Sequence, residues 1–181
     1  MLGFAQLLEH DVADRLEAPQ IERLARIRSA GTHLLALIDE VLDLSAVEAG
    51  ALPVALQPVD LDRVLDEVRQ WVLPMAEECG VSLRAADGDA RVLADERRLR
   101  QVLANLLTNA IKYNRRGGRV DLELGRDRDG ESPVWLRVRD TGVGIAPEDL
   151  EQIFEPFQRG AHQGGRIEGT GIGLSVTRSL V

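Results

Sequence analysis

The chain has 181 residues, of which 44% are hydrophobic and 29% charged, a balance typical of a folded globular protein and not of a disordered or fibrous one. Its formal net charge of -8 excludes binding modes that need a broad basic surface, so we expect no nucleic-acid partner. The single cysteine, Cys79, excludes an intrachain disulfide. The sequence contains no run of about 18 apolar residues, so it predicts no membrane-spanning helix.

The first predicted element is a helical hairpin within residues 1–52. Apolar residues at the start fit the last turns of a first helix, and a proline-containing connection leads to the second. Over Gln20–Glu48 the apolar residues recur at multiples of seven, which is typical of a helix packed in a bundle. Gly50 and Pro53 end this pattern, so we place a domain boundary there and expect residues 53–181 to form a mixed α/β unit.

A helix and a strand pair are predicted at the start of this unit. Asp60 is expected to cap a helix whose apolar side includes Trp71, and Pro74 is expected to kink or end that helix. Residues 81–85 and 91–94 are predicted to form a pair of strands, joined across an Asp-Gly-Asp turn.

A second helix and a hairpin follow. Asp95 is expected to cap the helix, whose apolar residues share one side: Leu99, Leu103, Leu106 and Ala110. Residues 119–125 and 134–139 alternate apolar and polar side chains around an Asp-Gly turn, which predicts an antiparallel hairpin with one buried face.

The last third of the chain is predicted to contain two short helices and a loop. Pro147 is expected to open a short helix that reaches Phe154. Residues 155–169 are polar and rich in glycine, which favours a loop, and residues 171–181 fit the start of a final helix.

Four residues of the Asp95 helix form a candidate ligand-binding stripe. They lie at i, i+4, i+7 and i+8, along one border of the apolar side: Asn105, Asn109, Lys112 and Tyr113. Amide oxygens are hard ligands suited to Mg²⁺, and we predict that Asn109 is the metal ligand. Taken alone, the stripe leaves open the alternative that both asparagines hydrogen-bond to nearby backbone.

Two glycine-rich segments add candidate sites. Asp140-Thr141-Gly142-Val143-Gly144-Ile145 follows a predicted strand, so its carboxylate could accept a hydrogen bond from an adenine amino group beside an apolar wall that includes Ile145, although a simple turn is the alternative. Gly169-Thr170-Gly171-Ile172-Gly173-Leu174 precedes the last helix, whose N-terminal N–H groups would favour a phosphate. Its spacing matches neither a Walker A loop nor the dinucleotide fingerprint.

In this order the segments resemble the ATP-binding domain of two-component sensor histidine kinases. The stripe looks like the N box, the segment at Asp140 the first glycine box, Phe154-Glu-Pro-Phe157 the F box, and the segment at Gly169 the second glycine box. The resemblance covers about residues 53–181 and extends upstream, where residues 34–50 are similar to the second helix of the family's dimerisation and phosphotransfer hairpin. It implies an α+β fold, a two-layer sandwich of the Bergerat type with a mixed sheet under helices, preceded by a helical hairpin.

The resemblance also implies cofactors and roles. ATP and Mg²⁺ would be the cofactors, with Asn109 on the metal, Asn105 and Lys112 near the phosphates, and Tyr113 along the nucleotide. Asp140 would accept a hydrogen bond from the adenine amino group, and Gly142 and Gly144 would line the base pocket. Gly171 and Gly173 would receive the phosphates, and Phe157 would anchor the loop. The other cofactor-binding positions would be Ile145, Thr170 and Leu174. Arg159 could reach the terminal phosphate.

The implied activity is phosphoryl transfer from ATP to a histidine and then to an aspartate of a response-regulator receiver domain. The family's phosphoacceptor motif, His-Glu-Leu-Arg-Thr-Pro, would fall before Met1, and His10, His33 and His162 do not stand in its context. We therefore expect a chain truncated at both ends, without a catalytic residue of its own for autophosphorylation. We expect this chain to be cytoplasmic even if the parent is membrane-anchored, and we expect the parent to dimerise through the hairpin.

Two alternatives remain. One is a stand-alone ATPase related to gyrase, chaperones and mismatch-repair proteins, although those enzymes place a glutamate base where this chain has Asn105. The other is a non-catalytic module that binds nucleotide and dimerises.

Overall fold

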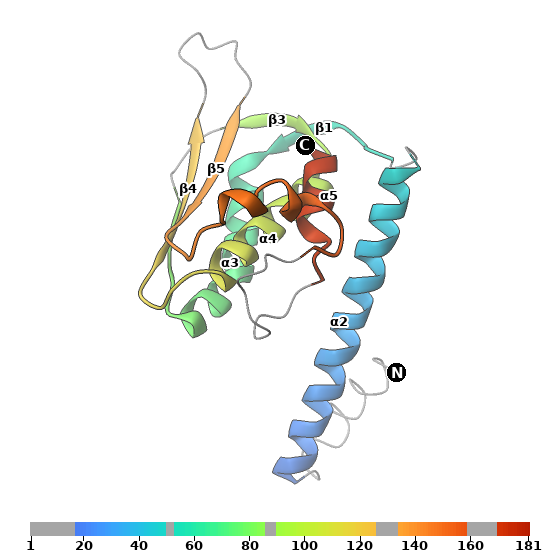
Figure 1. Ribbon diagram of the computed structural model, residues 1–181, viewed down its shortest axis with the longest axis vertical. Helices are drawn as coiled ribbons and strands as arrows, with labels where there is room; N and C mark the ends of the chain where they lie inside the picture. The colour runs from blue at the N-terminus through green and yellow to red at the C-terminus, as the bar shows by residue number, and fades with distance from the viewer. Residues whose placement is uncertain (1–16, 50–52, 86–89, 126–133, 159–169) are drawn as a thin grey trace. The chain divides into compact units, whose positions relative to one another are not determined.

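The computed structural model describes residues 17–49, 53–85, 90–125, 134–158 and 170–181 (Figure 1). The chain divides into two compact units, Met1–Gly50 and Ala51–Val181, which we call the helical unit and the α/β unit. The domain assignment 1–52 and 53–181 stays a prediction, and so does the first arm of the hairpin, which lies outside the described residues.

The described part of the helical unit is one helix, α2 (Ala18–Glu48), of 31 residues. It confirms the helix expected from Gln20, and its first turn contains Pro19, where a missing N–H costs no hydrogen bond. Several of its large apolar side chains are exposed, among them Ile27, Leu34 and Leu42. In the part of the chain that the structure describes, no helix is long and apolar enough to cross a membrane.

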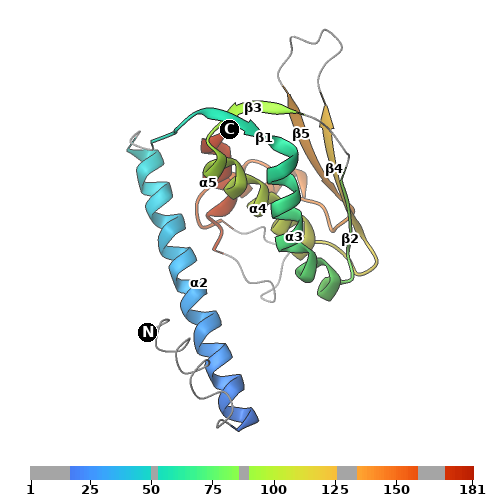
Figure 2. The same cartoon turned by 180° about the vertical axis from the view of Figure 1, so that it is seen from behind.

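The α/β unit contains two small sheets. β1 (Gln57–Asp60) pairs antiparallel with β3 (Arg91–Ala94), whereas β2 (Ser82–Ala85), β4 (Arg119–Gly125) and β5 (Trp135–Asp140) form a mixed sheet in the order β2-β4-β5. The helices α3 (Leu61–Cys79), α4 (Glu96–Lys112) and α5 (Gly173–Leu180) lie on one side of the mixed sheet in both views (Figures 1 and 2). The expected two-layer arrangement is therefore confirmed.

The predicted hairpin of residues 81–85 and 91–94 is wrong, although both strands exist. β2 pairs parallel with β4, from Ser82 opposite Arg119 to Ala85 opposite Leu122, and β3 pairs with β1. A parallel pair needs a crossover connection, and α4 lies in that connection. β1 was not predicted, because a four-residue Gln-Pro-Val-Asp strand carries almost no pattern.

Helix α3 runs further than the sequence indicates. Asp60 caps it as predicted, accepting a hydrogen bond from the Arg63 N–H at 3.1 Å. The helix does not end at Pro74 but continues to Cys79, where Gly80 at φ 67° closes it. Pro74 is exposed, so water can satisfy the carbonyl that loses its partner. Trp71, expected on the apolar side, is 63% exposed.

Helix α4 lies at the centre of the core. Asp95 caps it as predicted, accepting from the Arg98 N–H at 3.1 Å. A second bond from the Ala55 N–H is the main reason that the pKa of Asp95 lies below its usual value. The fully buried side chains of α4 face α3 and the sheet: Leu103, Leu107 and Ile111. Leu106, expected among them, is only half-buried.

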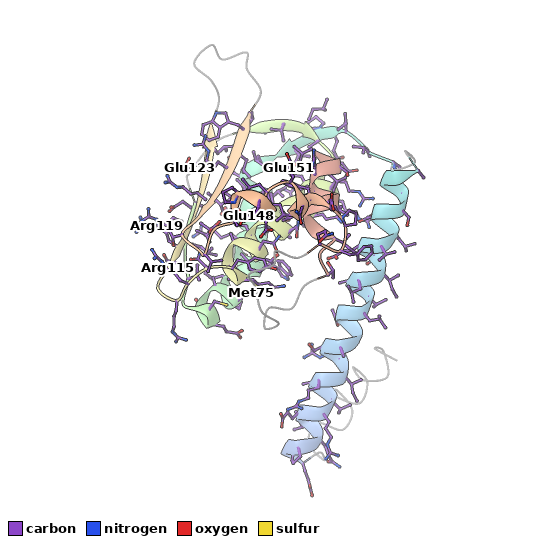
Figure 3. All side chains as sticks on the ribbon, in the orientation of Figure 1. Met75, Arg115, Arg119, Glu123, Glu148 and Glu151 are labelled. Atoms are coloured by element: carbon purple, nitrogen blue, oxygen red, sulfur yellow. The ribbon has the colours of Figure 1, made fainter. Side chains whose placement is uncertain are left out.

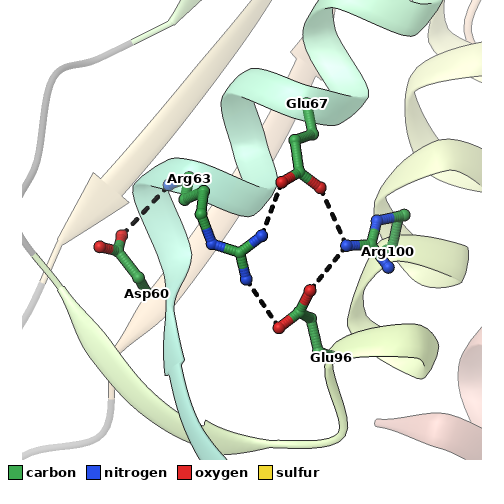
Figure 4. A network of polar contacts seen from close by, with 5 residues as sticks. All are labelled: Asp60, Arg63, Glu67, Glu96 and Arg100. Atoms are coloured by element: carbon green, nitrogen blue, oxygen red, sulfur yellow. Dashed lines mark hydrogen bonds and ion pairs between the residues drawn. The ribbon is translucent and has the colours of Figure 1, made fainter.

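A closed ring of four charges joins α3 to the first turn of α4 (Figure 4). Arg63 contacts Glu67 at 2.6 Å and Glu96 at 2.7 Å, and Arg100 contacts the same two carboxylates at 2.9 Å and 2.7 Å. The hydrogen bond from Arg100 lowers the pKa of Glu67, and the bond from Arg63 lowers the pKa of Glu96. All four side chains are partly exposed, so water screens the attraction.

The outer face of the mixed sheet carries ion pairs instead of a second helix layer. Arg119 contacts Asp121 at 2.9 Å within β4, and Arg137 of β5 contacts Glu123 at 3.1 Å. Figure 3 labels Arg119 and Glu123 along β4. Arg137 also lies 5.0 Å from the ring centre of Trp135. The alternation predicted for this hairpin, with one buried and one polar face, is confirmed.

The short helix predicted from Pro147 to Phe154 is wrong. Two separate 3-10 turns occupy this stretch, η2 (Pro147–Asp149) and η3 (Gln152–Phe154). Glu155 is extended, with ψ 137°, because a residue before proline is disfavoured in the helical region and Pro156 follows. The chain then enters α5 at Gly173, close to the expected start.

Candidate functional site

The polar stripe of α4 carries two side-chain amides that bond to each other. Asn105 and Asn109 are half-buried, and the Asn109 Nδ2 group lies 3.4 Å from the Asn105 Oδ1 atom, which accepts its hydrogen bond. The Asn105 Nδ2 group donates to the hydroxyl of Thr177 on α5 at 2.7 Å. Among the described residues neither amide bonds to backbone, so the alternative that these asparagines serve only nearby main chain does not hold.

At the other end of the stripe, Asp140 lies beside the C-terminal end of α4. Alternate residues of a strand share a face, so Asp140 lies on the same side of β5 as Leu136 and Val138, the side covered by helices. The Val143 N–H donates to the carbonyl of Tyr113 at 3.2 Å. A Cβ atom at Gly142 would overlap that carbonyl, so only glycine allows this approach.

Asp140 is held by its own turn. Its Oδ1 atom accepts from the Gly142 N–H at 2.8 Å, and no other described residue donates to it. Its Oδ2 atom therefore remains as an acceptor for a ligand. Gly144 adopts φ 71°, where an added Cβ atom would meet open space, and Ile145 beyond it is half exposed.

Hydrogen bonds around Asn114 hold the segment that follows Asp140 in place. Asn114 donates to the carbonyls of Ala110 and Arg119, at 3.1 Å and 3.0 Å. The Thr141 hydroxyl donates to Asn114 and accepts from the Arg119 N–H. Sequence reasoning missed Asn114, although an asparagine directly after a helix often organises a turn through its side chain.

The second glycine segment leads into α5 against Asn105. Gly171 adopts φ 74°, and the Ile172 N–H donates to the Thr170 hydroxyl at 3.1 Å. A Cβ atom at Gly173 would overlap the Asn105 amide. Among the residues that the structure describes, no side chain caps the start of α5, so its first N–H groups can serve an anion.

The F-box segment is tied to this glycine segment through its main chain. The Phe157 N–H donates to the Gly171 carbonyl at 3.0 Å, and Phe157 itself adopts φ 65° with its ring 65% exposed. The guanidinium of Arg178 on α5 lies 5.3 Å from the ring centre of Phe154. Arg159, the predicted contact of the terminal phosphate, lies outside the described residues.

The donor chemistry of the stripe fits a magnesium ion that is shared with a phosphate. In the part of the chain that the structure describes, no group of three or more His, Cys, Asp or Glu residues could hold a metal by itself. Mg²⁺ usually takes one or two protein oxygens, water and phosphate oxygens. Because Asn109 turns its Nδ2 group toward Asn105, its Oδ1 atom is left for such an ion.

The structure thus brings together most of the residues selected from sequence. Asn105, Asn109 and Tyr113 share one side of α4, with Gly142 packed on one end and Gly173 on the other. Lys112 lies in the last turn of α4, and its side chain is exposed. Thr177 was missed, because a threonine inside a helix carries no sequence signal for a contact 72 residues away.

Comparison with known proteins gives concordant matches. Residues 94–181 match the family described as histidine kinase-, DNA gyrase B-, and HSP90-like ATPase. Over 99% of its length the chain is 36% identical to the non-motile and phage-resistance protein of Caulobacter vibrioides, and over its whole length it is 32% identical to the cell-division control histidine kinase PdhS of Brucella suis. The matches cover 22% and 18% of these relatives, so the chain spans about a fifth of their length.

Among solved structures, a crystal structure of full-length ShkA in complex with AMPPNP is similar to the chain. The similarity covers 99% of this chain and 36% of ShkA, with a TM-score of 0.76 and 35% sequence identity.

Proposed function

Because the chain belongs to the sensor histidine kinases and contains their ATPase domain, we propose that it binds Mg-ATP along helix α4. The intact protein would transfer the γ-phosphoryl group to a histidine and then to an aspartate of a response-regulator receiver domain. It would dimerise through the helical hairpin, for which the exposed apolar side chains of α2 provide a surface.

The observation that carries the proposal is the packing of two glycine segments onto opposite ends of one polar stripe. Gly173 lies against Asn105, and Gly142 lies against Tyr113. An α-helix rises about 12 Å over the eight residues between these two positions. The two ends are therefore far enough apart to hold a base at one and phosphates at the other.

The end of the stripe at Tyr113 suits adenine. Asp140 offers its Oδ2 atom to an amino-group donor, while its Oδ1 atom is fixed by the Gly142 N–H. Ile145 contributes apolar surface nearby in sequence, and the ring of Tyr113 is half-buried. A carboxylate beside an apolar surface recognises the 6-amino group of adenine and rejects the 6-oxo group of guanine.

The end at Asn105 suits phosphates. The N-terminus of α5 favours negative charge, and the Asn109 Oδ1 atom would complete the coordination of Mg²⁺. Lys112, which precedes Tyr113 in the last turn of α4, would have to extend its side chain toward the phosphates from the adenine end. The metal supplies neutralisation of phosphate charge when it is bound. The protein's part is to position the nucleotide, which provides most of the catalysis in phosphoryl transfer.

The neutral amide of Asn105 argues against a stand-alone ATPase. A neutral amide is too weak a base to take a proton from water, and here its nitrogen donates to Thr177 and its oxygen accepts from Asn109. We expect slow intrinsic ATP hydrolysis by the purified chain. Steady-state turnover as fast as that of a dedicated ATPase would contradict this expectation.

The histidines of the chain are not proposed as phosphoacceptors. His33 lies within α2, without the sequence context of the family motif, and His10 and His162 lie outside the described residues. The acceptor would belong to a longer form of the protein. The relatives are several times as long as this chain.

Nucleotide titration tests the proposal directly. The purified chain should bind a fluorescent ATP analogue more tightly with Mg²⁺ than with EDTA, and Asn109→Ala should remove most of that difference. Gln70→Ala, which removes an exposed amide on α3, is the matched control and should bind as the wild type does. A folded wild-type chain that binds no analogue would favour the non-catalytic module instead.

A further inference from the structure

A chain of hydrogen bonds runs from α5 to the predicted metal ligand. The Thr177 hydroxyl accepts from Asn105 Nδ2 at 2.7 Å, and Asn105 Oδ1 accepts from Asn109 Nδ2 at 3.4 Å. Thr177 is 8% exposed, which makes it one of two buried polar residues among those that the structure describes. The other, Ser175, bonds to the backbone of its own helix.

The direction of this chain fixes which end of each amide faces the ligand site. A side-chain amide has a donor end and an acceptor end, and the two are similar in shape. In the structure Thr177 takes the nitrogen of Asn105, and the oxygen of Asn105 faces Asn109. Asn109 then points its Nδ2 group toward Asn105. Its Oδ1 atom points away from Asn105 and is the only end of the amide that can bind a cation.

Gly173 gives Asn105 the room that this arrangement needs. A Cβ atom at 173 would lie 2.8 Å from Asn105 Cγ and 3.0 Å from its Nδ2 atom. Residues 173 and 177 are one turn apart on the same side of α5. One helix therefore provides both the space and the hydrogen-bond acceptor that hold the amide.

We infer that Thr177 is a positioning residue that orients the Asn105–Asn109 amide pair toward Mg²⁺. This inference rests on the proposed function, since it concerns the same metal. Thr177 would touch neither nucleotide nor metal and would act through Asn105 alone. Removal of its hydroxyl leaves a half-buried amide without its acceptor and lets both amides turn over.

The substitution Thr177→Val tests the inference, because valine keeps the shape and loses the hydroxyl. Binding of AMPPNP is measured with Mg²⁺ and with EDTA for the wild type, Thr177→Val and Thr177→Ser. We expect Thr177→Val to lower the affinity in Mg²⁺ by about tenfold, as is typical when a partner of a metal ligand is removed, and to leave the affinity in EDTA unchanged. Thr177→Ser should bind as the wild type does.

The matched control is Ser179→Ala, which removes an exposed hydroxyl from the same helix, one that bonds only to the Ser175 carbonyl. It should change neither affinity. Equal loss in Mg²⁺ and in EDTA for Thr177→Val would show a merely structural role and overturn the inference. Wild-type affinity for Thr177→Val, or a Thr177→Ser variant as weak as Thr177→Val, would overturn it too.

Two further readouts separate the possible failures. A wild-type chain that binds no AMPPNP in either condition would overturn the proposed function and this inference with it, whereas all other contrary results above overturn only the inference. If Thr177→Val does not fold, NMR of the wild type decides: the Asn105 side-chain NH₂ protons should exchange slowly with solvent. Exchange as fast as that of an exposed amide would overturn the inference.

Discussion

The two ends of α4 are held by different kinds of interaction. Its first turns, Glu96 to Arg100, are fixed to α3 by a ring of charged side chains that are partly exposed (Figure 4). Its last turns, Asn105 to Tyr113, are fixed by neutral amides, by backbone contacts and by glycines that allow close approach.

The difference separates what stabilises the domain from what shapes the site. Exposed charges contribute little and depend on pH and salt. Neutral amides do not titrate, so the contact between Asn105 and Asn109 itself carries no charge that changes with pH. Substitutions in the charge ring should therefore leave the geometry of the ligand end unchanged, provided that the core that both ends share remains intact.

The largest expected effect comes from the core that both ends share. Leu103 is fully buried, between the charge ring and Asn105 in sequence. Leu103→Ala should lower the free energy of unfolding by about 2–5 kcal/mol, because it removes buried methyl groups and leaves a cavity. Urea denaturation measures this, and a loss below about 1 kcal/mol would show that the two ends do not share one packed core.

Gly173→Ala should act chiefly on the ligand end. The added Cβ atom overlaps the Asn105 amide, and overpacking of this kind costs about 1–3 kcal/mol. The affinity for Mg-AMPPNP should fall about 5-fold to 150-fold if that cost falls on the bound geometry. Isothermal titration checks the affinity, and binding as tight as that of the wild type would mean that Asn105 moves aside without consequence for the ligand.

Asp140→Asn should change selectivity more than stability. The amide can present a donor where adenine needs an acceptor, so the affinity for an ATP analogue should fall about tenfold. The preference for the ATP analogue over the matching GTP analogue should shrink in parallel. Competition binding with both analogues at one Mg²⁺ concentration measures this, and an unchanged preference would remove Asp140 from base recognition.

The smallest effect is expected at the charge ring, and it depends on pH. The pKa values of Glu67 and Glu96 are lowered in the folded chain, so the folded state holds fewer protons than the unfolded state near pH 4. Their contribution is present above the unfolded value of about 4.3 and is lost as the pH falls through the lowered values.

The double variant Glu67→Gln/Glu96→Gln should therefore unfold at lower urea than the wild type at pH 7, and the gap should close below about pH 4. Mg-AMPPNP affinity at pH 7 should not change. The control is Glu77→Gln, which removes an exposed carboxylate from α3, the helix of Glu67. A gap that persists at pH 3, or a loss of nucleotide affinity, would break the separation between the two ends of α4.

The sequence was sufficient where the determining interactions are local. Helical spacing placed Asn105, Asn109 and Tyr113 on one side of α4, and the caps at Asp60 and Asp95 lie where they were expected. Strand alternation predicted the β4–β5 hairpin with one buried face, and Asp140 was expected at the end of its second strand. These features depend on residues a few positions apart, so a single sequence reveals them.

The tertiary structure decided the contacts that close across the chain. Ser82 reaches the carbonyl of Gly118, and Asn105 reaches Thr177 over 72 residues. β2 pairs with β4 and not with β3, which follows it in the sequence, and α3 continues beyond Pro74. No local preference specifies such partners, because each depends on how the whole unit buries its apolar surface, and for the same reason the role of Thr177 became visible only in three dimensions.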